Sequence, residues 1–168
     1  MTQFASFIAG EPIASGLPSD WTQELGTFTA QVVADATTSG LTDRILNTSA
    51  DSVSGHISWN TPGSITDQEI LTLTNFTGPV ANATIYFTAL GRLTTPGHIT
   101  GYSLAFLSNS TGGGIVWHFD RLDDGTAVVV GSDVSFTWVT GTWYWSRLRI
   151  NGTTLFGKVW TLGNPEPI

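Results

Sequence analysis

The sequence predicts an all-β protein built from antiparallel sheets. Short runs that alternate apolar and polar side chains recur along its 168 residues, and a period of two is typical of strands with one buried face. Glycine, proline, asparagine and aspartate separate these runs, as expected for tight turns. Helical periodicity is nearly missing, apart from a turn or two near Ala34–Thr38. Many short strands without helical insertions favour a β-sandwich or a barrel.

The individual strands follow from the alternating runs and the turns between them. The most regular run has Tyr102, Leu104 and Phe106 on one face, and Asp124-Gly125 is a plausible hairpin turn further along. The segment 163–168 contains two prolines and cannot continue a strand, because proline lacks the ladder donor. In chain order we expect strands at Thr27–Val33, Leu41–Asn47, Ile57–Trp59, Gln68–Leu73, Ala83–Leu90, Gly101–Leu107, Gly114–Arg121, Ala127–Val130, Thr142–Ile150 and Thr153–Trp160.

Composition bounds the class of protein. Seven Trp and nine Phe argue against disorder, and the length suits one domain at 1–162 with a short Pro-rich tail at 163–168. The net charge of −7, with six Lys and Arg, disfavours nucleic acid and anionic lipid as partners. There is no cysteine for disulfides or thiolate metal sites. We expect neither a signal peptide nor a transmembrane segment.

The last hairpin carries the densest chemistry. Two alternating runs flank Asn151-Gly152, a pair that favours a type I′ turn because both residues tolerate positive φ. With these two residues at the centre of the turn, Ile150 faces Thr153 and Trp145 faces Lys158, close enough for a cation–π contact. One face of the ribbon, called here the aromatic–cationic face, then collects Trp143, Trp145, Arg147, Arg149, Lys158 and Trp160.

Three roles are open for the aromatic–cationic face. Trp and Arg are enriched at protein-interface hot spots, and flat Trp rings also stack on sugars. Trp is equally a natural core residue, and a sandwich must bury one face of each sheet. Buried cations need partners or must reach solvent, so three cations favour solvent or an interface. The sequence leaves a structural role, a protein interface and a glycan site as alternatives.

The order of several motifs resembles a known family. The chain starts with Phe4-x-x-Phe7 and Pro18-Ser-Asp-Trp21, continues with Asp67-Gln-Glu-Ile70, and closes with Trp143-Tyr-Trp and Pro165-Glu-Pro167. This pattern is similar to the concanavalin A-like lectin/glucanase (LamG-like) jelly-roll domain of tailed-phage virion proteins. The resemblance implies an antiparallel jelly-roll β-sandwich of two packed sheets and a virion location. It also implies that Phe4–Ile8 lies beside the last hairpin.

Glucanases of this fold place three carboxylates on one strand face, within reach of one glycosidic bond. The nearest match here is Ile65-x-Asp67-x-Glu69, with isoleucine at the position of the nucleophile. Asp67 and Glu69 remain as a pair, interpreted either as a residual acid/base or cation site or as a charge pair facing solvent. We therefore do not expect an enzyme.

Metal-binding signals are weak. His56, His98 and His118 are widely separated, and we interpret His118 with Asp120 as a surface hydrogen bond rather than a metal site. Aspartates around one turn supply the hard oxygen ligands that calcium prefers, although aspartate also caps turns without a metal. No other cofactor is expected. The calcium candidates are Asp120, Asp123 and Asp124, with Asp133 nearby.

These observations favour a structural protein of a phage particle. We expect a capsid decoration or tail accessory subunit on the particle surface that binds other virion proteins through its β-sandwich. By analogy to decoration proteins we expect a homo-oligomer, with a trimer as the suggested form. The alternative is a carbohydrate-binding module for cell-surface glycans. A degenerate glycoside hydrolase is the third interpretation.

Overall fold

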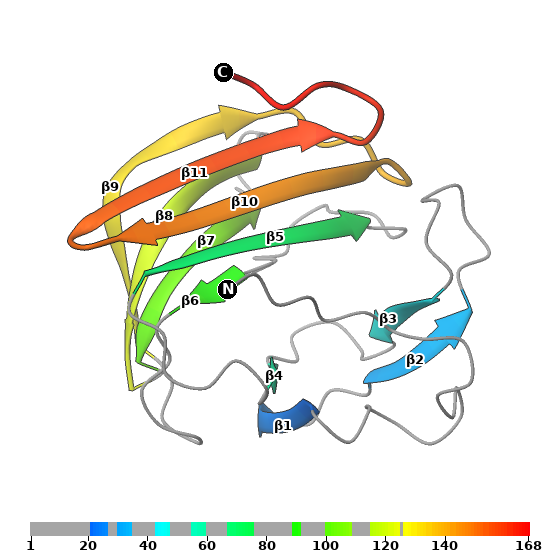
Figure 1. Ribbon diagram of the computed structural model, residues 1–168, viewed down its shortest axis with the longest axis horizontal. Coiled ribbons are helices and arrows are strands. Elements are labelled where there is room, and N and C mark those ends of the chain that lie inside the picture. Colours follow the sequence, from blue (N-terminus) through cyan, green and yellow to red (C-terminus); the bar gives the residue numbers. More distant parts are fainter. Residues whose placement is uncertain are drawn as a thin grey trace. The chain divides into compact units, whose positions relative to one another are not determined.

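The computed structural model describes residues 21–26, 30–34, 43–47, 55–59, 67–75, 89–91, 100–108, 115–124 and 126–168. Strands, turns and irregular segments account for these residues (Figure 1). No helix in this part of the chain is long and apolar enough to cross a membrane. The chain divides into two compact units, Met1–Gly63 and Ser64–Ile168, which are treated separately below.

Two antiparallel strand pairs form the described part of the first unit. Strand β1 (Trp21–Gly26) pairs with β4 (Gly55–Trp59), and β2 (Ala30–Ala34) pairs with β3 (Asp43–Asn47). The sequence predicted β2, β3 and β4 with shifted ends, but it missed β1, where polar residues interrupt the alternation.

The second unit contains two antiparallel sheets. The first has the strand order β11-β10-β5 and the second β6-β7-β8-β9, and neighbouring strands pair antiparallel in both. Antiparallel all-β structure, as predicted, is therefore confirmed for the described residues. The strands are β5 (Gln68–Asn75), β6 (Ala89–Gly91), β7 (Gly101–Ser108), β8 (Ile115–Asp123), β9 (Thr126–Phe136), β10 (Trp143–Asn151) and β11 (Thr154–Thr161).

Residues of both sheets form one hydrophobic core. Leu104 of β7 and Leu148 of β10 are fully buried, with Ile150 beside them. Side chains of β5, β8 and β11 pack against these three residues. At Gly157 of β11 an added Cβ would lie 2.9 Å from the Phe119 ring and 3.1 Å from Leu104, so the strands approach more closely than a larger residue allows. This contact fixes which face of β11 turns inward.

An aromatic cluster closes one end of the core. The rings of Trp138 and Tyr144 have centroids 4.1 Å apart, and Phe136 meets Tyr144 edge-on at 5.2 Å. The Tyr144 hydroxyl accepts a hydrogen bond of 3.0 Å from the Val139 backbone N–H. The cluster ties the connection between β9 and β10 to the first residues of β10.

Most strand predictions for this unit agree with the structure, with one difference. Strand β9 was expected to end at Val130 but continues to Phe136, because a bulge interrupts its pairing without ending it. The predicted strand Ala83–Leu90 lies largely outside the described residues, as do Phe4–Ile8 and residues 35–38, while Ala34 ends β2.

Candidate functional site

The β10–β11 hairpin has a different register from the one predicted. Asn151 pairs with Thr154 and Ile150 with Leu155, so Gly152 and Thr153 occupy the centre of the turn. Gly152 has a φ of +55°, whereas Thr153 is not among the residues with positive φ. Glycine at the first central position is the pattern of a type II′ turn rather than type I′. The predicted pairing of Ile150 with Thr153 is therefore wrong by two residues.

Contacts outside the hairpin account for this register. The Asp67 Oδ1 atom accepts a 3.0 Å hydrogen bond from the Gly152 backbone N–H, and the inward side of Gly157 meets Phe119. Asp67, which was interpreted as a candidate acid or cation ligand, thus caps the turn. These tertiary contacts override the local preference of Asn-Gly for a type I′ turn.

The shift by two residues preserves the faces of the hairpin, because side chains alternate with a period of two. Leu148 and Ile150 point into the core, so the odd-numbered residues of β10 lie on the opposite side. Their cross-strand neighbours on that side include Phe156, Lys158 and Trp160, and all three were expected there. The aromatic–cationic face therefore exists as a surface; its role in binding stays a prediction.

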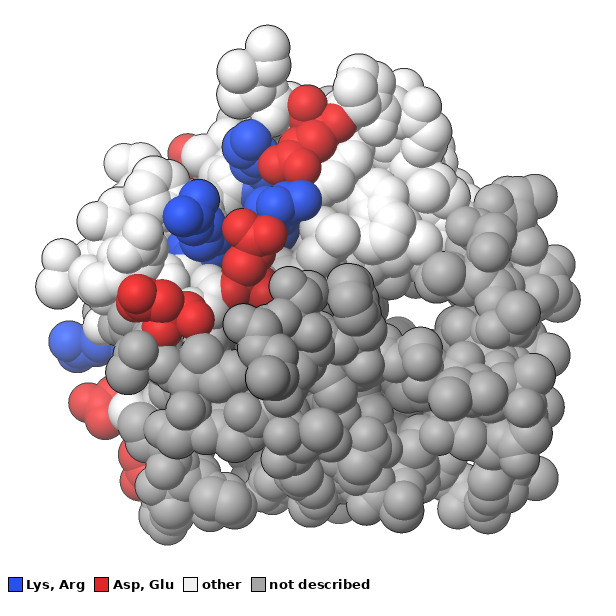
Figure 2. All heavy atoms as spheres, in the orientation of Figure 1, with Lys and Arg blue, Asp and Glu red and all other residues white. Residues whose placement is uncertain are grey.

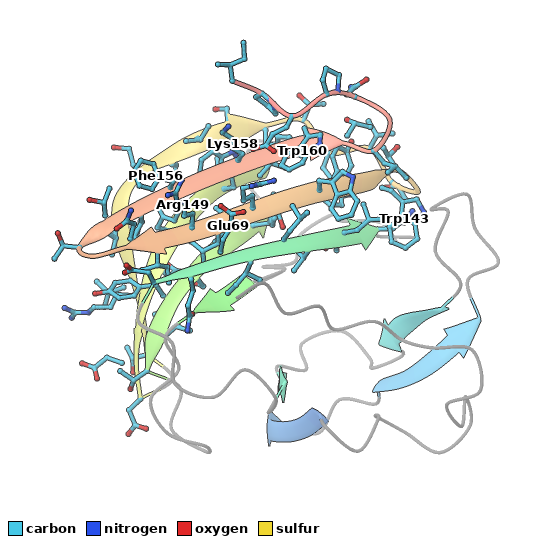
Figure 3. The ribbon with its side chains drawn as sticks, viewed as in Figure 1. Glu69, Trp143, Arg149, Phe156, Lys158 and Trp160 are labelled. Atoms are coloured by element: carbon cyan, nitrogen blue, oxygen red, sulfur yellow. The ribbon has the colours of Figure 1, made fainter. Side chains whose placement is uncertain are left out.

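The aromatic contacts of this face differ from those expected. Trp145 lies opposite Trp160, and the two rings stack with centroids 6.4 Å apart and an interplanar angle of 26°. The expected contact of Trp145 with Lys158 is replaced by a cation–π contact in which Arg149 Cζ lies 5.9 Å from the Phe156 ring centroid. Figure 3 labels Arg149, Phe156, Lys158 and Trp160 along the hairpin.

Trp143 has little surface to offer a ligand. It is 9 % exposed, and its carbonyl accepts a 2.9 Å hydrogen bond from the Leu162 backbone N–H. Trp145 and Trp160 are half-buried. Phe156 is 52 % exposed, and Leu71 on the adjoining strand β5 is 45 % exposed. The accessible apolar surface is thus centred on Phe156 and Leu71 rather than on the tryptophans.

Two cations of the face are directly opposed. Arg147 pairs with Lys158 across the strands, an arrangement that is destabilising by itself because like charges face each other. Glu166 bridges them: its Oε2 lies 2.9 Å from Arg147 Nη2, and its Oε1 lies 3.1 Å from Lys158 Nζ. On the other side Glu69 Oε1 accepts a 2.7 Å hydrogen bond from Arg147 Nη1. Figure 2 shows the resulting patch of mixed charge.

Glu166 belongs to the segment Gly163–Ile168, called here the closing segment, which folds back onto the hairpin. Gly163 has a φ of +92°, a conformation that suits glycine, and the Asn164 N–H donates to the Thr161 carbonyl at 3.1 Å. Lys158 Nζ also donates a 2.7 Å hydrogen bond to the Pro167 carbonyl. The aromatic–cationic face thus holds a peptide of its own chain by side-chain and backbone groups.

A second polar cluster lies on β8. His118 is 3 % exposed, so the prediction of a surface hydrogen bond is wrong. Its Nδ1 lies 2.9 Å from Asp133 Oδ1 of β9, and its Nε2 lies 3.3 Å from Asp120 Oδ1. Burial raises the pKa of the Asp120 carboxyl above its usual value, and the nearby Asp133 adds to this, whereas His118 counteracts it.

The backbone of β9 brings Asp133 to this cluster. Val130 pairs with Phe119 and Val134 with Trp117, so three residues of β9 lie opposite His118. Gly131 in this bulge has a φ of +88°. A bulge redirects the side chains that it contains. Sequence reasoning did not place Asp133 beside His118, although a glycine inside a valine-rich strand is a recognised sign of a bulge.

The calcium candidates are not brought together. Asp120 is buried beside His118, whereas Asp124 occupies the β8–β9 turn with a φ of +48°. Asp123 pairs with Thr126, as the predicted Asp124-Gly125 turn requires. Within the described ranges no group of three acidic, histidine or cysteine side chains could hold a metal ion. Ile65 and His98 lie outside those ranges, and His56 is described only as part of β4.

Comparison with known proteins provides no family for the chain: no family model, curated protein or solved structure matches it. Glu69 and Glu166 are functional-site residues that the sequence did not single out as partners of the cations. The signal for Glu69 was its spacing of two residues from Asp67, which indicated a shared strand face. For Glu166 there was the Pro-Glu-Pro motif alone.

Proposed function

We propose that this protein is a non-enzymatic structural subunit of a phage particle that binds another particle protein through the aromatic–cationic face. The observation that carries the proposal is the docking of the closing segment. Arg147 and Lys158 hold its Glu166 carboxylate, and Lys158 also binds the Pro167 carbonyl. These are the contacts by which a surface binds an acidic, proline-containing peptide.

The exposed residues of the face support a protein partner. Phe156 and Leu71 present apolar surface, and Arg149 lies over the Phe156 ring. An aromatic and arginine pair bordered by polar groups is a typical composition for an interface hot spot. The docked closing segment would then form part of the surface that the partner contacts.

The proposal includes a jelly-roll β-sandwich and a location on the virion surface. A core formed by residues from two antiparallel sheets agrees with a sandwich. The phage assignment rests on the sequence motifs around Trp143–Trp160 and on the Pro165-Glu-Pro167 segment. A non-enzymatic role agrees with the contacts of the Asp67 and Glu69 carboxylates, since Asp67 caps a turn and Glu69 pairs with Arg147.

Reattachment to particles assembled without this protein tests the proposal. We expect the double variant Arg149→Ser/Phe156→Ser to lose at least tenfold in affinity, because both side chains are exposed and neither belongs to the core. Val139→Ser is the matched control, since Val139 is 54 % exposed and lies outside the hairpin. Equal reattachment of all three proteins, or none by the unmodified protein, would contradict the proposal.

A carbohydrate-binding module remains the second candidate, favoured by the stacked Trp145–Trp160 pair. Glycan-array binding that is lost in Trp145→Ala would support this alternative. Hydrolysis of β-glucans that is abolished by Glu69→Gln would instead support the third candidate, a glycoside hydrolase.

A further inference from the structure

The tip of the β10–β11 hairpin contains a chemically labile pair of residues. Asn151-Gly152 is the only Asn-Gly pair in the sequence. Glycine has no side chain to shield its backbone nitrogen from the preceding asparagine amide, and its backbone has the freedom that ring closure between the two residues requires. Asn151, Gly152 and Thr153 are all exposed. Water and hydroxide therefore reach this pair in the folded protein.

Deamidation of this pair needs water as its only co-reactant. The Gly152 backbone nitrogen loses its proton to hydroxide and attacks Asn151 Cγ. The new N–Cγ bond forms as the Cγ–Nδ2 bond breaks, and the departing nitrogen takes a proton from water, so that ammonia leaves and hydroxide is restored. Water then opens the cyclic imide at one of its two carbonyls. Opening at Cγ gives aspartate at position 151, and opening at the main-chain carbonyl gives isoaspartate.

Asp67 restrains the attacking nitrogen. The Gly152 N–H donates a 3.0 Å hydrogen bond to Asp67 Oδ1, and this is the proton that must leave before the attack. While the hydrogen bond is in place, an amide anion would form beside a carboxylate, where a second negative charge is disfavoured. The pairing of Asn151 with Thr154 and the φ of +55° at Gly152 also fix the nitrogen within a tight turn.

We propose that Asn151 is a modification site that converts spontaneously to aspartate and isoaspartate, and that Asp67 sets the rate by holding the Gly152 N–H. The inference goes beyond the proposed function, because the reaction is one of the chain with water and needs no partner. The hydrogen bond to Asp67 is exposed, so the turn can open locally while the core stays folded. Deamidation then proceeds from the small population of open turns.

The products change the end of the aromatic–cationic face. Asn151 is the last residue of β10 and lies on the same side of the strand as Arg149. A carboxylate at position 151 offers Arg149 a charge partner that competes with its contact over the Phe156 ring. Isoaspartate also adds a carbon to the main chain beside the Asn151–Thr154 pair. Any effect on partner binding rests on the proposed function, whereas the modification itself does not.

Peptide mapping by mass spectrometry tests the site in the intact chain at mildly alkaline pH. The unmodified protein should deamidate at Asn151 at least tenfold more slowly when folded than when unfolded in urea. Asp67→Ala should accelerate the reaction of the folded protein at least fivefold and leave the rate in urea unchanged. Asn164 is the internal control, because Pro165 follows it and has no N–H to lose.

Thr72→Ala is the matched control for a general loosening of β5. It removes the 2.6 Å hydrogen bond between Thr72 Oγ1 and Ser146 Oγ, which lies on the same strand pair away from the turn, and it should not accelerate the folded reaction. Equal folded rates for Asp67→Ala and the unmodified protein, or equal acceleration by Thr72→Ala, would overturn the role of Asp67. Absence of reaction at Asn151 in folded Asp67→Ala would overturn the site. All these rates are measured on the isolated protein, so they are independent of reattachment to particles.

Discussion

Two hairpins of the second unit, β8–β9 and β10–β11, differ in how their outer strands are protected. Strand β11 has Lys158 on its outward face, and the closing segment places Glu166 and Pro167 over it. Strand β9 has three exposed valines and no charge before its bulge. Both strands lie at the border of a described sheet. The outer strand of the β10–β11 hairpin is thus covered by a segment of its own chain, whereas the valine side chains of β9 are exposed.

The largest expected effect concerns the core side of the β10–β11 hairpin. Leu148→Ala should lower the free energy of unfolding by about 2–5 kcal/mol, because Leu148 is fully buried and its truncation leaves a cavity. Urea unfolding followed by tryptophan fluorescence measures this change. A loss below about 1 kcal/mol would show that the hairpin packs on the core less closely than the structure indicates.

The next effect concerns Glu166, the bridge between the opposed cations. Glu166→Gln should destabilise the protein by about 1 kcal/mol, because Arg147 and Lys158 then face each other without a carboxylate between them. The expected loss of stability is modest because all three side chains are partly exposed to solvent.

The control for this prediction is the double variant Glu166→Gln/Lys158→Gln, which removes the repulsion as well. In a double-mutant cycle, the double variant should lose less stability than the sum of the losses measured for the two single variants. Additive losses would show that Glu166 does not act by neutralising the cation pair.

A smaller effect is expected for pH dependence in the β8–β9 hairpin. Burial raises the pKa of Asp120 in the folded protein above its ordinary value of 3.8, so the folded state binds more protons than the unfolded state between 3.8 and the folded pKa. Stability from this group is therefore highest at low pH and falls as pH rises through that window. Asp120→Asn should reduce the fall, as measured by urea unfolding at a series of pH values. An unchanged slope would contradict the burial of this carboxylate.

The smallest effect on stability is expected on β9. Val129→Thr should change the free energy of unfolding of the monomer by less than about 0.5 kcal/mol, because Val129 is 51 % exposed and outside the core. Dilute protein in urea measures this value. A loss comparable to that of Leu148→Ala would show that β9 is buried within its own chain and would remove the contrast between the hairpins.

The sequence predicted the strands of the second unit better than their pairing. The alternation of Tyr102, Leu104 and Phe106 identifies β7 locally, although Ser103 and Ala105 on its other face are buried as well. The Asn151-Gly152 pair has a local preference as well, for a type I′ turn. The register is decided instead by contacts between residues distant in the sequence, those of Asp67 with Gly152 and of Gly157 with Phe119. No single-sequence pattern contains those contacts.

The candidate site divides in the same way. The six residues of the aromatic–cationic face follow from the period of a strand and tolerate a register error of two residues. Their partners do not follow from it: Glu69 reaches Arg147 from another strand, and Glu166 returns through a glycine with positive φ. Similarly, Asp133 reaches His118 only through the β9 bulge. The valine run before Gly131 by itself predicts a regular strand, in which this contact would not form.

The stacked indoles of Trp145 and Trp160 give the hairpin an optical property of its own. Two indole transition dipoles held at a fixed angle couple and produce a paired signal in far-ultraviolet circular dichroism. Each ring lies next to a cation that the closing segment neutralises, so release of that segment would alter the electric field at the pair. The protein therefore contains a label-free indicator of whether its closing segment is docked, readable in solution without any added dye.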